Sequence, residues 1–308
     1  MTPYGGQLDT ELFHADPCRF LDNAIKEYVR TSPLNHLAAF DNAPIVDEPI
    51  VGFADGDDRI FQDLKTIIGE FHLTPREIME KYIAGKRWRF GAAGSIDRIG
   101  VISWALPLTR ETRVGERSSP FGGSPRYNHS RWIGIKLYES LSQYVAALLE
   151  VLGCNAVAPT ESKLFEIKPM PGDWMAANWS ERHVAYASGL GTFGLNGLMI
   201  TTRGCAVYLG SVVCDRALAA TPRSASPTAN CLFFRGELCG RCIARCIGSA
   251  ISEKGRSNSA CLANLRDRQA DKVRSLGLDK GLIGPAPACG RCSTGVPCED
   301  KIPSLTDV

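Results

Sequence analysis

The sequence has little net charge, few histidines and no long apolar run. Its 35 Lys and Arg residues nearly balance 33 Asp and Glu residues, which leaves a formal net charge of +2. This balance gives no bulk electrostatic basis for binding nucleic acid or a membrane surface. No stretch of about 18 apolar residues is present, so we predict no membrane span. The first residues lack the basic and apolar regions of a secretory signal, and we therefore expect a cytoplasmic protein.

The length and composition are those of an ordinary globular protein. At 308 residues, with 44% hydrophobic and 22% charged residues, the chain can form one large domain and a small one. His14, His36 and His72 lie in the first part of the chain without mutual spacing. Single histidines are usually surface or capping groups, so we do not expect these three to bind a metal.

Residues 1–90 are predicted to be mostly helical and to pack on the core. The segments 21–29 and 60–71 carry apolar residues at helical spacing. Thr74 is a candidate N-cap, followed by Pro75 at the first position of another helix.

Residues 91–225 indicate an α/β layer. The apolar, β-branched run 98–108 is typical of a buried strand. A loop rich in Gly, Ser, Pro and Arg follows at 109–126, and then a helix is predicted over 128–152 and a short strand over 154–159. This order of strand, loop, helix and strand favours an α/β layer. The loop is a candidate lid over a substrate or cofactor, and a solvated loop is the alternative.

A glycine-rich segment lies between a predicted helix, 180–188, and a predicted strand, 206–215. Residues 189–194, GLGTFG, match the letters G-x-G-x-x-G. The match follows a helix and not a strand, so we do not expect a dinucleotide-binding fold. Glycines at this density let the backbone turn sharply or approach a flat ligand closely.

A linker rich in Pro, Ser and Ala at 218–230 marks the boundary between the α/β layer and a C-terminal unit, residues 226–308. The C-terminal unit contains eight of the twelve cysteines. Two intervals have identical content, CGRC at 239–242 and CGRC at 289–292. In a cytoplasmic protein, clustered cysteines indicate metal ligands more often than disulfides. Eight thiols in two clumps suit two four-iron clusters in a small ferredoxin-like module.

The spacing also divides the cysteines between the two clusters. Bacterial two-cluster ferredoxins follow C-x2-C-x2-C-x3-C-P, and the last cysteine binds the other cluster. Here three residues separate Cys242 from Cys246, and the following IGSAIS resembles the tail after a crossing ligand. We therefore predict one [4Fe–4S] cluster on Cys231, Cys239, Cys242 and Cys298, and the other on Cys246, Cys261, Cys289 and Cys292.

A pair of structural zinc sites is the alternative, because C-x2-C pairs also bind zinc. The remaining cysteines are predicted to be buried apolar residues: Cys18, Cys154, Cys205 and Cys214.

The segment SERHVAYASGLGTFGLNGLMITTRGCAVYLG, together with the cysteine-rich unit after it, resembles the epoxyqueuosine reductases and, more distantly, the corrinoid-dependent reductive dehalogenases. The resemblance covers roughly residues 95 to 300. It implies an oxidoreductase with a nitroreductase-like α/β domain that holds base-off cobalamin. It also implies a ferredoxin-like module that receives low-potential electrons from a ferredoxin or flavodoxin and passes them to a small-molecule substrate.

The resemblance also implies roles for residues. In the epoxyqueuosine reductases the segment begins with Asp-Arg, whose carboxylate is thought to protonate the substrate, and Glu181 with Arg182 stands in that place here. An acid that complements the helix dipole is the alternative for Glu181. The implied backbone contacts to the cofactor are Gly189, Gly191, Gly194, Asn196 and Gly197. Further candidate donors, for which packing or surface roles are the alternative, are Tyr127, His129, Arg131, His183 and Tyr186.

The epoxyqueuosine reductases often carry helical repeats beyond the clusters that help to bind tRNA. This chain ends soon after Cys298 and is nearly neutral, so we do not expect tRNA as the substrate. Two other classes stay open: an electron-transfer protein with clusters and no corrinoid, and a reductase that contains a flavin.

Overall fold

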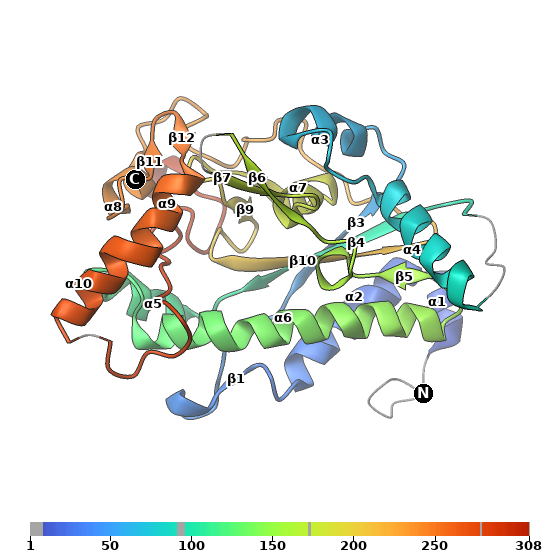
Figure 1. The fold of residues 1–308 in the computed structure, drawn as a ribbon, viewed down its shortest axis with the longest axis horizontal. Coiled ribbons are helices and arrows are strands. Elements are labelled where there is room, and N and C mark those ends of the chain that lie inside the picture. The colour runs from blue at the N-terminus through green and yellow to red at the C-terminus, as the bar shows by residue number, and fades with distance from the viewer. Residues whose placement is uncertain (1–8, 91–95, 172–173, 278, 308) are drawn as a thin grey trace.

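The computed structural model describes residues 9–90, 96–171, 174–277 and 279–307. Its centre is a four-stranded antiparallel sheet with the strand order β3-β4-β10-β5 (Figure 1). The strands are β3 (Ile50–Asp55), β4 (Gly100–Pro107), β10 (Val207–Cys214) and β5 (Ala156–Val157). The predicted mixture of helices and strands is confirmed, and because every pairing in this sheet is antiparallel, it is of the α+β kind.

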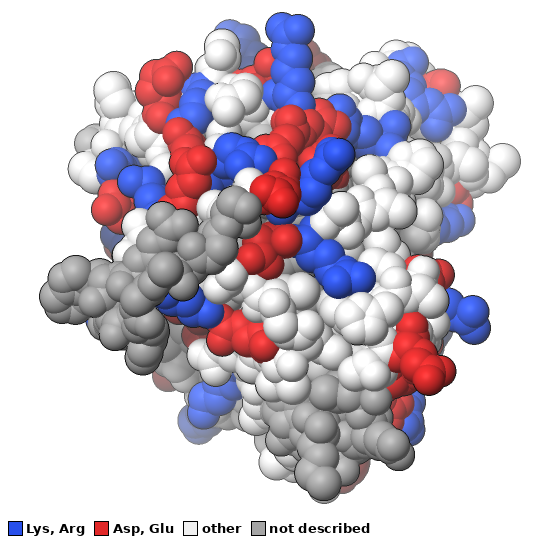
Figure 2. Space-filling model, turned by 90° about the vertical axis from the view of Figure 1, so that its right-hand side faces the viewer, with Lys and Arg blue, Asp and Glu red and all other residues white. Residues whose placement is uncertain are grey.

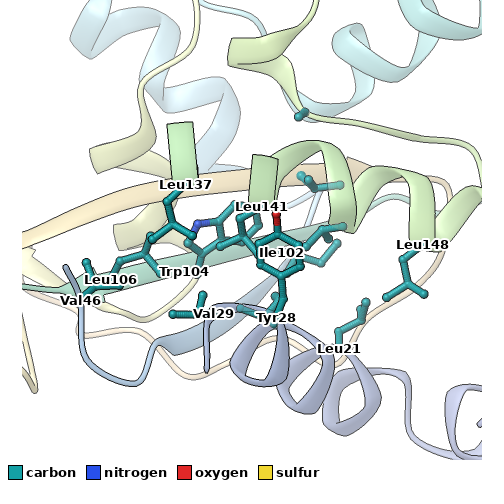
Figure 3. Close-up of a cluster of buried hydrophobic side chains, with 14 of the residues drawn as sticks. Leu21, Tyr28, Val29, Val46, Ile102, Trp104, Leu106, Leu137, Leu141 and Leu148 are labelled. Atoms are coloured by element: carbon teal, nitrogen blue, oxygen red, sulfur yellow. The ribbon is translucent and has the colours of Figure 1, made fainter. Parts of the chain in front are cut away.

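Two long helices cover one face of the sheet, as Figure 1 shows. They are α2 (Pro17–Thr31) and α6 (Pro125–Val151). Side chains alternate along a strand, so Ile102, Trp104 and Leu106 of β4 all point to this face. Leu137 and Leu141 of α6 pack against them (Figure 3). The prediction of a buried strand followed by a long helix is therefore confirmed.

Three helices pack on the opposite face. They are α3 (Ile60–Ile68), α4 (Pro75–Phe90) and α7 (Glu181–Ala187). Val101 and Val213, which alternate with the residues of the first face, join this second core. The predicted start of α4 is confirmed, because the Glu77 N–H donates to Thr74 Oγ1 (3.2 Å) and the Thr74 N–H donates to Glu77 Oε2 (2.8 Å).

The N-terminal segment also contributes β3, a strand that the sequence analysis did not identify. β3 pairs with β4, and its other edge is covered by the linker after β10. The Thr221 N–H donates to Phe53 O (2.9 Å), and the Phe53 N–H donates to Thr221 Oγ1 (3.0 Å). Arg223 forms an ion pair with Asp58 at 2.6 Å. The linker is therefore held against the sheet.

The predicted loop at 109–126 is wrong over its first half, which forms α5 (Arg110–Ser118). The buried side chains of this helix are polar: Thr112, Arg113 and Glu116. The helix has no apolar stripe, and for this reason its sequence resembles a solvated loop.

The remaining elements are short. They are α1 (Thr10–Ala15), β1 (His36–Leu37), β2 (Ala43–Pro44), β6 (Ile167–Met170), β7 (Trp174–Ala177), β8 (Gly191–Phe193) and β9 (Met199–Thr201). The C-terminal unit contains α8 (Arg241–Arg245), β11 (Ile251–Ser252), β12 (Gly255–Arg256), α9 (Asn258–Ala263), a π-helical turn (Asn264–Arg268) and α10 (Gln269–Ser275). This unit lies at one end of the sheet (Figure 1).

The charged surface reflects the nearly equal numbers of acidic and basic residues. Acidic and basic side chains are interspersed on the face that Figure 2 shows. Within the described ranges, no helix combines the length and the apolar character that crossing a membrane requires.

Candidate functional site

Four cysteines of the C-terminal unit surround a small cavity beside the β8–β9 hairpin. The cavity is lined by Cys231, Cys239, Cys242 and Cys298, and Gly194 and Asn196 are among the other lining residues. Burial, together with the nearby thiols of Cys298, Cys231 and Cys239, raises the pKa of Cys242 to about 12. We call these four thiols the outer group.

The other four cysteines line a second cavity of about 150 Å³: Cys246, Cys261, Cys289 and Cys292. Burial raises the pKa of Cys289 to about 12 and that of Cys292 to about 11, and the Cys261 thiol adds to both shifts. Thiols that are this buried and this close together hold their protons unless a cation replaces them. We call these four thiols the inner group.

The two linings follow the division that the ligand spacing predicts. In the described part of the chain, no three His, Cys, Asp or Glu side chains converge as ligands to a single metal ion would. A four-iron cluster instead distributes its thiolates over four irons, so its ligands surround a cavity. The donor set and its arrangement fit such a cluster, and the assignment of the eight thiols as ligands stays a prediction.

Cys205 is a ninth thiol near these groups that the sequence analysis treated as an ordinary apolar residue. It is buried, and its Sγ lies 3.7 Å from the Sγ of Cys298. Asn196 Nδ2 donates to Cys205 Sγ (3.8 Å) and to Cys292 O (2.7 Å), so this amide connects the glycine-rich segment to both groups. Spacing could not have indicated Cys205, because it lies on the other side of the linker from the cysteine-rich unit.

Helix α5 anchors the inner group through the carboxylate of Glu116. This buried carboxylate accepts hydrogen bonds from the backbone N–H groups of Gly290 (2.8 Å), Gly123 (3.0 Å) and Ser124 (2.8 Å). Burial raises the pKa of Glu116, and the three backbone donors oppose that shift. The second CGRC segment is therefore fixed to the sheet domain at the residue that follows Cys289.

A buried ion-pair network fixes the chain beside Cys298 in the same way. Glu299 accepts hydrogen bonds from Arg113 Nε (3.3 Å) and Arg117 Nη2 (2.7 Å), both on α5. Arg113 also donates to Leu108 O (2.7 Å), just after β4. Glu299 and Arg113 are both buried, and each has a second ion-pair partner, Arg117 for Glu299 and Asp300 for Arg113.

A large cleft of about 1330 Å³ lies next to the inner group. Glu181 at the start of α7 lines it, and so does Cys289 of the inner group. The cleft and the inner cavity also share Tyr127 and Tyr208 in their linings. Pockets for drug-sized ligands measure about 300–1000 Å³, so this cleft has room for a larger ligand.

The carboxyl group of Glu181 is buried in the wall of this cleft. Burial raises its pKa from 4.5 to about 7, and hydrogen bonds from Ser211, Tyr138 and Thr160 oppose the shift. Tyr138 Oη and Thr160 Oγ1 lie 3.4 and 3.5 Å from Glu181 Oε1. Oε2 is inaccessible to solvent and has no hydrogen-bond partner among the described residues. The group can therefore hold a proton near neutral pH.

Arg182 and His183, the next two residues of α7, also line the cleft and are half-buried. Burial and the charge of Arg182 lower the pKa of His183 to about 4, so this imidazole is neutral at pH 7. Its Nδ1 lies 2.7 Å from Ser180 Oγ, which means that the hydroxyl contacts the histidine and does not cap a backbone N–H. Arg182 Nη1 donates to Gly197 O at 2.6 Å.

The other candidate donors fall into two sets. Tyr127 and Arg131 line the cleft. Tyr186 donates to Ser224 O (2.8 Å), and His129 Nε2 lies 2.8 Å from Gly281 O, so these two contact protein backbone.

Tyr208 was not identified from the sequence, and His72, for which a surface or capping role was expected, is buried. Tyr208 lines both cavities, and its buried hydroxyl has no partner among the described residues. His72 is fully buried and stacks on Trp179, with ring centroids 6.2 Å apart. Neither of its ring nitrogens has a partner in the described ranges, and burial lowers its pKa to about 4.

The glycines of the glycine-rich segment allow close contacts within the protein. A Cβ at Gly191 would lie 2.3 Å from Ile200 O, and one at Gly189, which has φ +72°, would lie 2.7 Å from Pro222 O of the linker. Leu198, Met199 and Cys205 are the residues of this segment that line the cleft. The close approaches found at these two glycines are therefore to other parts of the chain.

No protein-family model matches the sequence, and no curated protein matches it. Solved structures of epoxyqueuosine reductase are similar to this chain. The enzyme from Bacillus subtilis gives a TM-score of 0.41 at 16% identity, with 91% of this chain and 65% of that chain covered. A structure with an epoxyqueuosine-modified tRNA-Tyr stem loop gives 0.41 at 15% identity, covering 91% and 65%. The enzyme from Streptococcus thermophilus gives 0.41 at 15% identity, covering 91% and 67%.

These structures belong to the group of enzymes that the sequence resembles. The chain spans 65% of the length of the first two.

Proposed function

We propose that the protein is an oxidoreductase in which the outer and inner groups each hold one [4Fe–4S] cluster. The observation that supports this most is the position of Cys289, which lines both the inner cavity and the large cleft. Cysteines of the outer group do not line the cleft. Electrons from a low-potential ferredoxin or flavodoxin would therefore enter at the outer group and leave through the inner group.

The cleft is proposed to bind a cobalamin-type cofactor and a small-molecule substrate. Its volume and its apolar wall, which includes Leu198, Met199 and Leu209, suit a large macrocycle. When bound, such a corrinoid supplies a strongly reducing metal centre. These apolar side chains would hold such a group by van der Waals contact.

Glu181 is the proposed proton donor. Tyr138 and Thr160 hold the carboxyl group through Oε1 in the wall of the cleft, where it would release its proton to the substrate. A carboxyl group with a pKa of about 7 is suited to general acid catalysis near neutral pH.

The test is an absorption spectrum of the protein purified without oxygen. Thiolate-to-iron absorption together with corrin bands is the expected result. A flavin doublet in place of the corrin bands would make the protein a flavin reductase, and iron–sulfur absorption alone would make it an electron-transfer protein. A protein that contained only zinc would contradict the proposal.

A further inference from the structure

Arg256 is a basic residue that lines the inner cavity together with the four thiols of the inner group. It lies on β12, at the end of the β11–β12 hairpin. Its Nη2 donates a hydrogen bond to Cys261 Sγ at 3.1 Å. Its Nε is buried and has no partner among the described residues, so a second N–H is available for an acceptor in the cavity.

The charge of Arg256 is not neutralised by a neighbouring acid. The ion pairs found in the described ranges join other basic residues, such as Arg113 with Glu299 and Arg203 with Asp47. Arg182 is a second basic residue whose charge interacts with that of Arg256. Burial and the charge of Arg256 lower the pKa of Arg182. A guanidinium charge without a carboxylate partner therefore lies beside the Cys261 thiol, on the side of the cavity away from the Glu116 carboxylate, which acts on Cys289.

The outer group has a different environment. The thiol of Cys205, a neutral group, lies 3.7 Å from Cys298 Sγ. Arg241 lines the outer cavity, but its side chain is exposed, and water screens its charge. Hydrogen bonds to the sulfurs, net charge and solvent exposure are the properties that set the reduction potential of an iron–sulfur cluster.

We propose that Arg256 is a positioning residue that acts through Cys261 and makes the inner cluster easier to reduce than the outer cluster. This inference rests on the proposed function. One electron leaves the reduced outer cluster and reduces the inner cluster, and no protein bond forms or breaks. The guanidinium stabilises the additional negative charge on the inner cluster, so the step toward the cleft is downhill.

Redox titrations followed by electron paramagnetic resonance test the proposal on the intact protein. The variants are Arg256→Gln and, as a matched control, Arg235→Gln, because Arg235 is exposed and lines neither cavity. The signal that survives in Cys231→Ser identifies the inner cluster. We expect Arg256→Gln to shift the reduction equilibrium of this signal about tenfold toward the oxidised form, which is about 59 mV for one electron. The outer signal and the control should not move.

An unchanged inner potential in Arg256→Gln, or an equal shift of the outer signal, would overturn the inference and leave the proposed function intact. If Arg256→Gln does not retain the inner iron, Arg256→Met decides, because methionine has an unbranched side chain and carries neither the charge nor the hydrogen-bond donors. A shift in the same direction is expected, and an unchanged potential again overturns the inference. A wild-type protein without iron would contradict the proposed function itself.

Discussion

The substitution Glu181→Gln tests whether burial raises the pKa of the Glu181 carboxyl group in the cleft wall. Burial raises the pKa of Glu181 from 4.5 to about 7, although Ser211, Tyr138 and Thr160 donate to the carboxylate. A difference of this size means that the folded protein holds this proton more tightly than the unfolded chain by about 3 kcal/mol. Glutamine has nearly the same shape and does not titrate.

The sign follows from a folded-state pKa that is higher than the unfolded-state value. The stabilisation from the bound proton is complete below about pH 4.5 and is lost as the pH rises through about 7. The wild-type protein should therefore lose stability relative to Glu181→Gln by about 2 kcal/mol between about pH 5.5 and about pH 8.5. For a chain of this size, that corresponds to a difference in Tm of about 4 °C.

The assay is thermal unfolding of both proteins across this pH range, with Glu111→Gln as a control because Glu111 is exposed on α5. The wild-type and control curves should fall together at high pH, while the Glu181→Gln curve stays flatter. Parallel curves for wild type and Glu181→Gln would refute the reasoning, because the carboxyl group would then have the same pKa in the folded and the unfolded protein. The same variant should also reduce substrate turnover by about 10²-fold or more.

Three further changes have defined outcomes. Cys231→Ser should lose about half of the bound iron, whereas Cys18→Ser should lose none, and iron analysis decides between loss from one group and loss from both. Glu116→Ala should lower the free energy of unfolding by about 3 kcal/mol or more in urea titrations, because it leaves three backbone N–H groups without an acceptor, and Glu111→Ala should not. His72→Phe should make the stability of the protein less sensitive to acid. The pKa of His72 is lowered from 6.5 to about 4 in the folded protein, so the wild-type protein loses stability as the pH falls through that interval. Equal acid unfolding of the two proteins would count against this.

The elements that the sequence predicted correctly are those whose burial is apolar and periodic. β4 is buried on both faces and reads as a continuous apolar run, and α6 carries Leu137, Leu141 and Val145 along one face. α5 was missed because the residues that it buries are Arg113, Glu116 and Thr112, and only their partners on distant segments make that burial favourable. A binary pattern of apolar and polar residues does not contain those partners.

The candidate site also has features that could be predicted from the sequence and features that could not. Cysteine spacing carries chemical information along the chain, so the outer and inner groups could be proposed without a structure. The cleft could not, because its wall comes from segments as distant as Ile67, Arg131, Glu181 and Pro287. The buried Oε2 of Glu181 and the position of Cys205 beside Cys298 likewise depend on the folded arrangement.

The central claim is that the outer and inner groups are the ligand sets of two iron–sulfur clusters. The most direct measurement is the metal and acid-labile sulfide content of the wild-type protein, purified and analysed without oxygen. The account predicts about eight iron and about eight sulfide per chain, with little zinc. Two zinc ions per chain, without iron or sulfide, would contradict it.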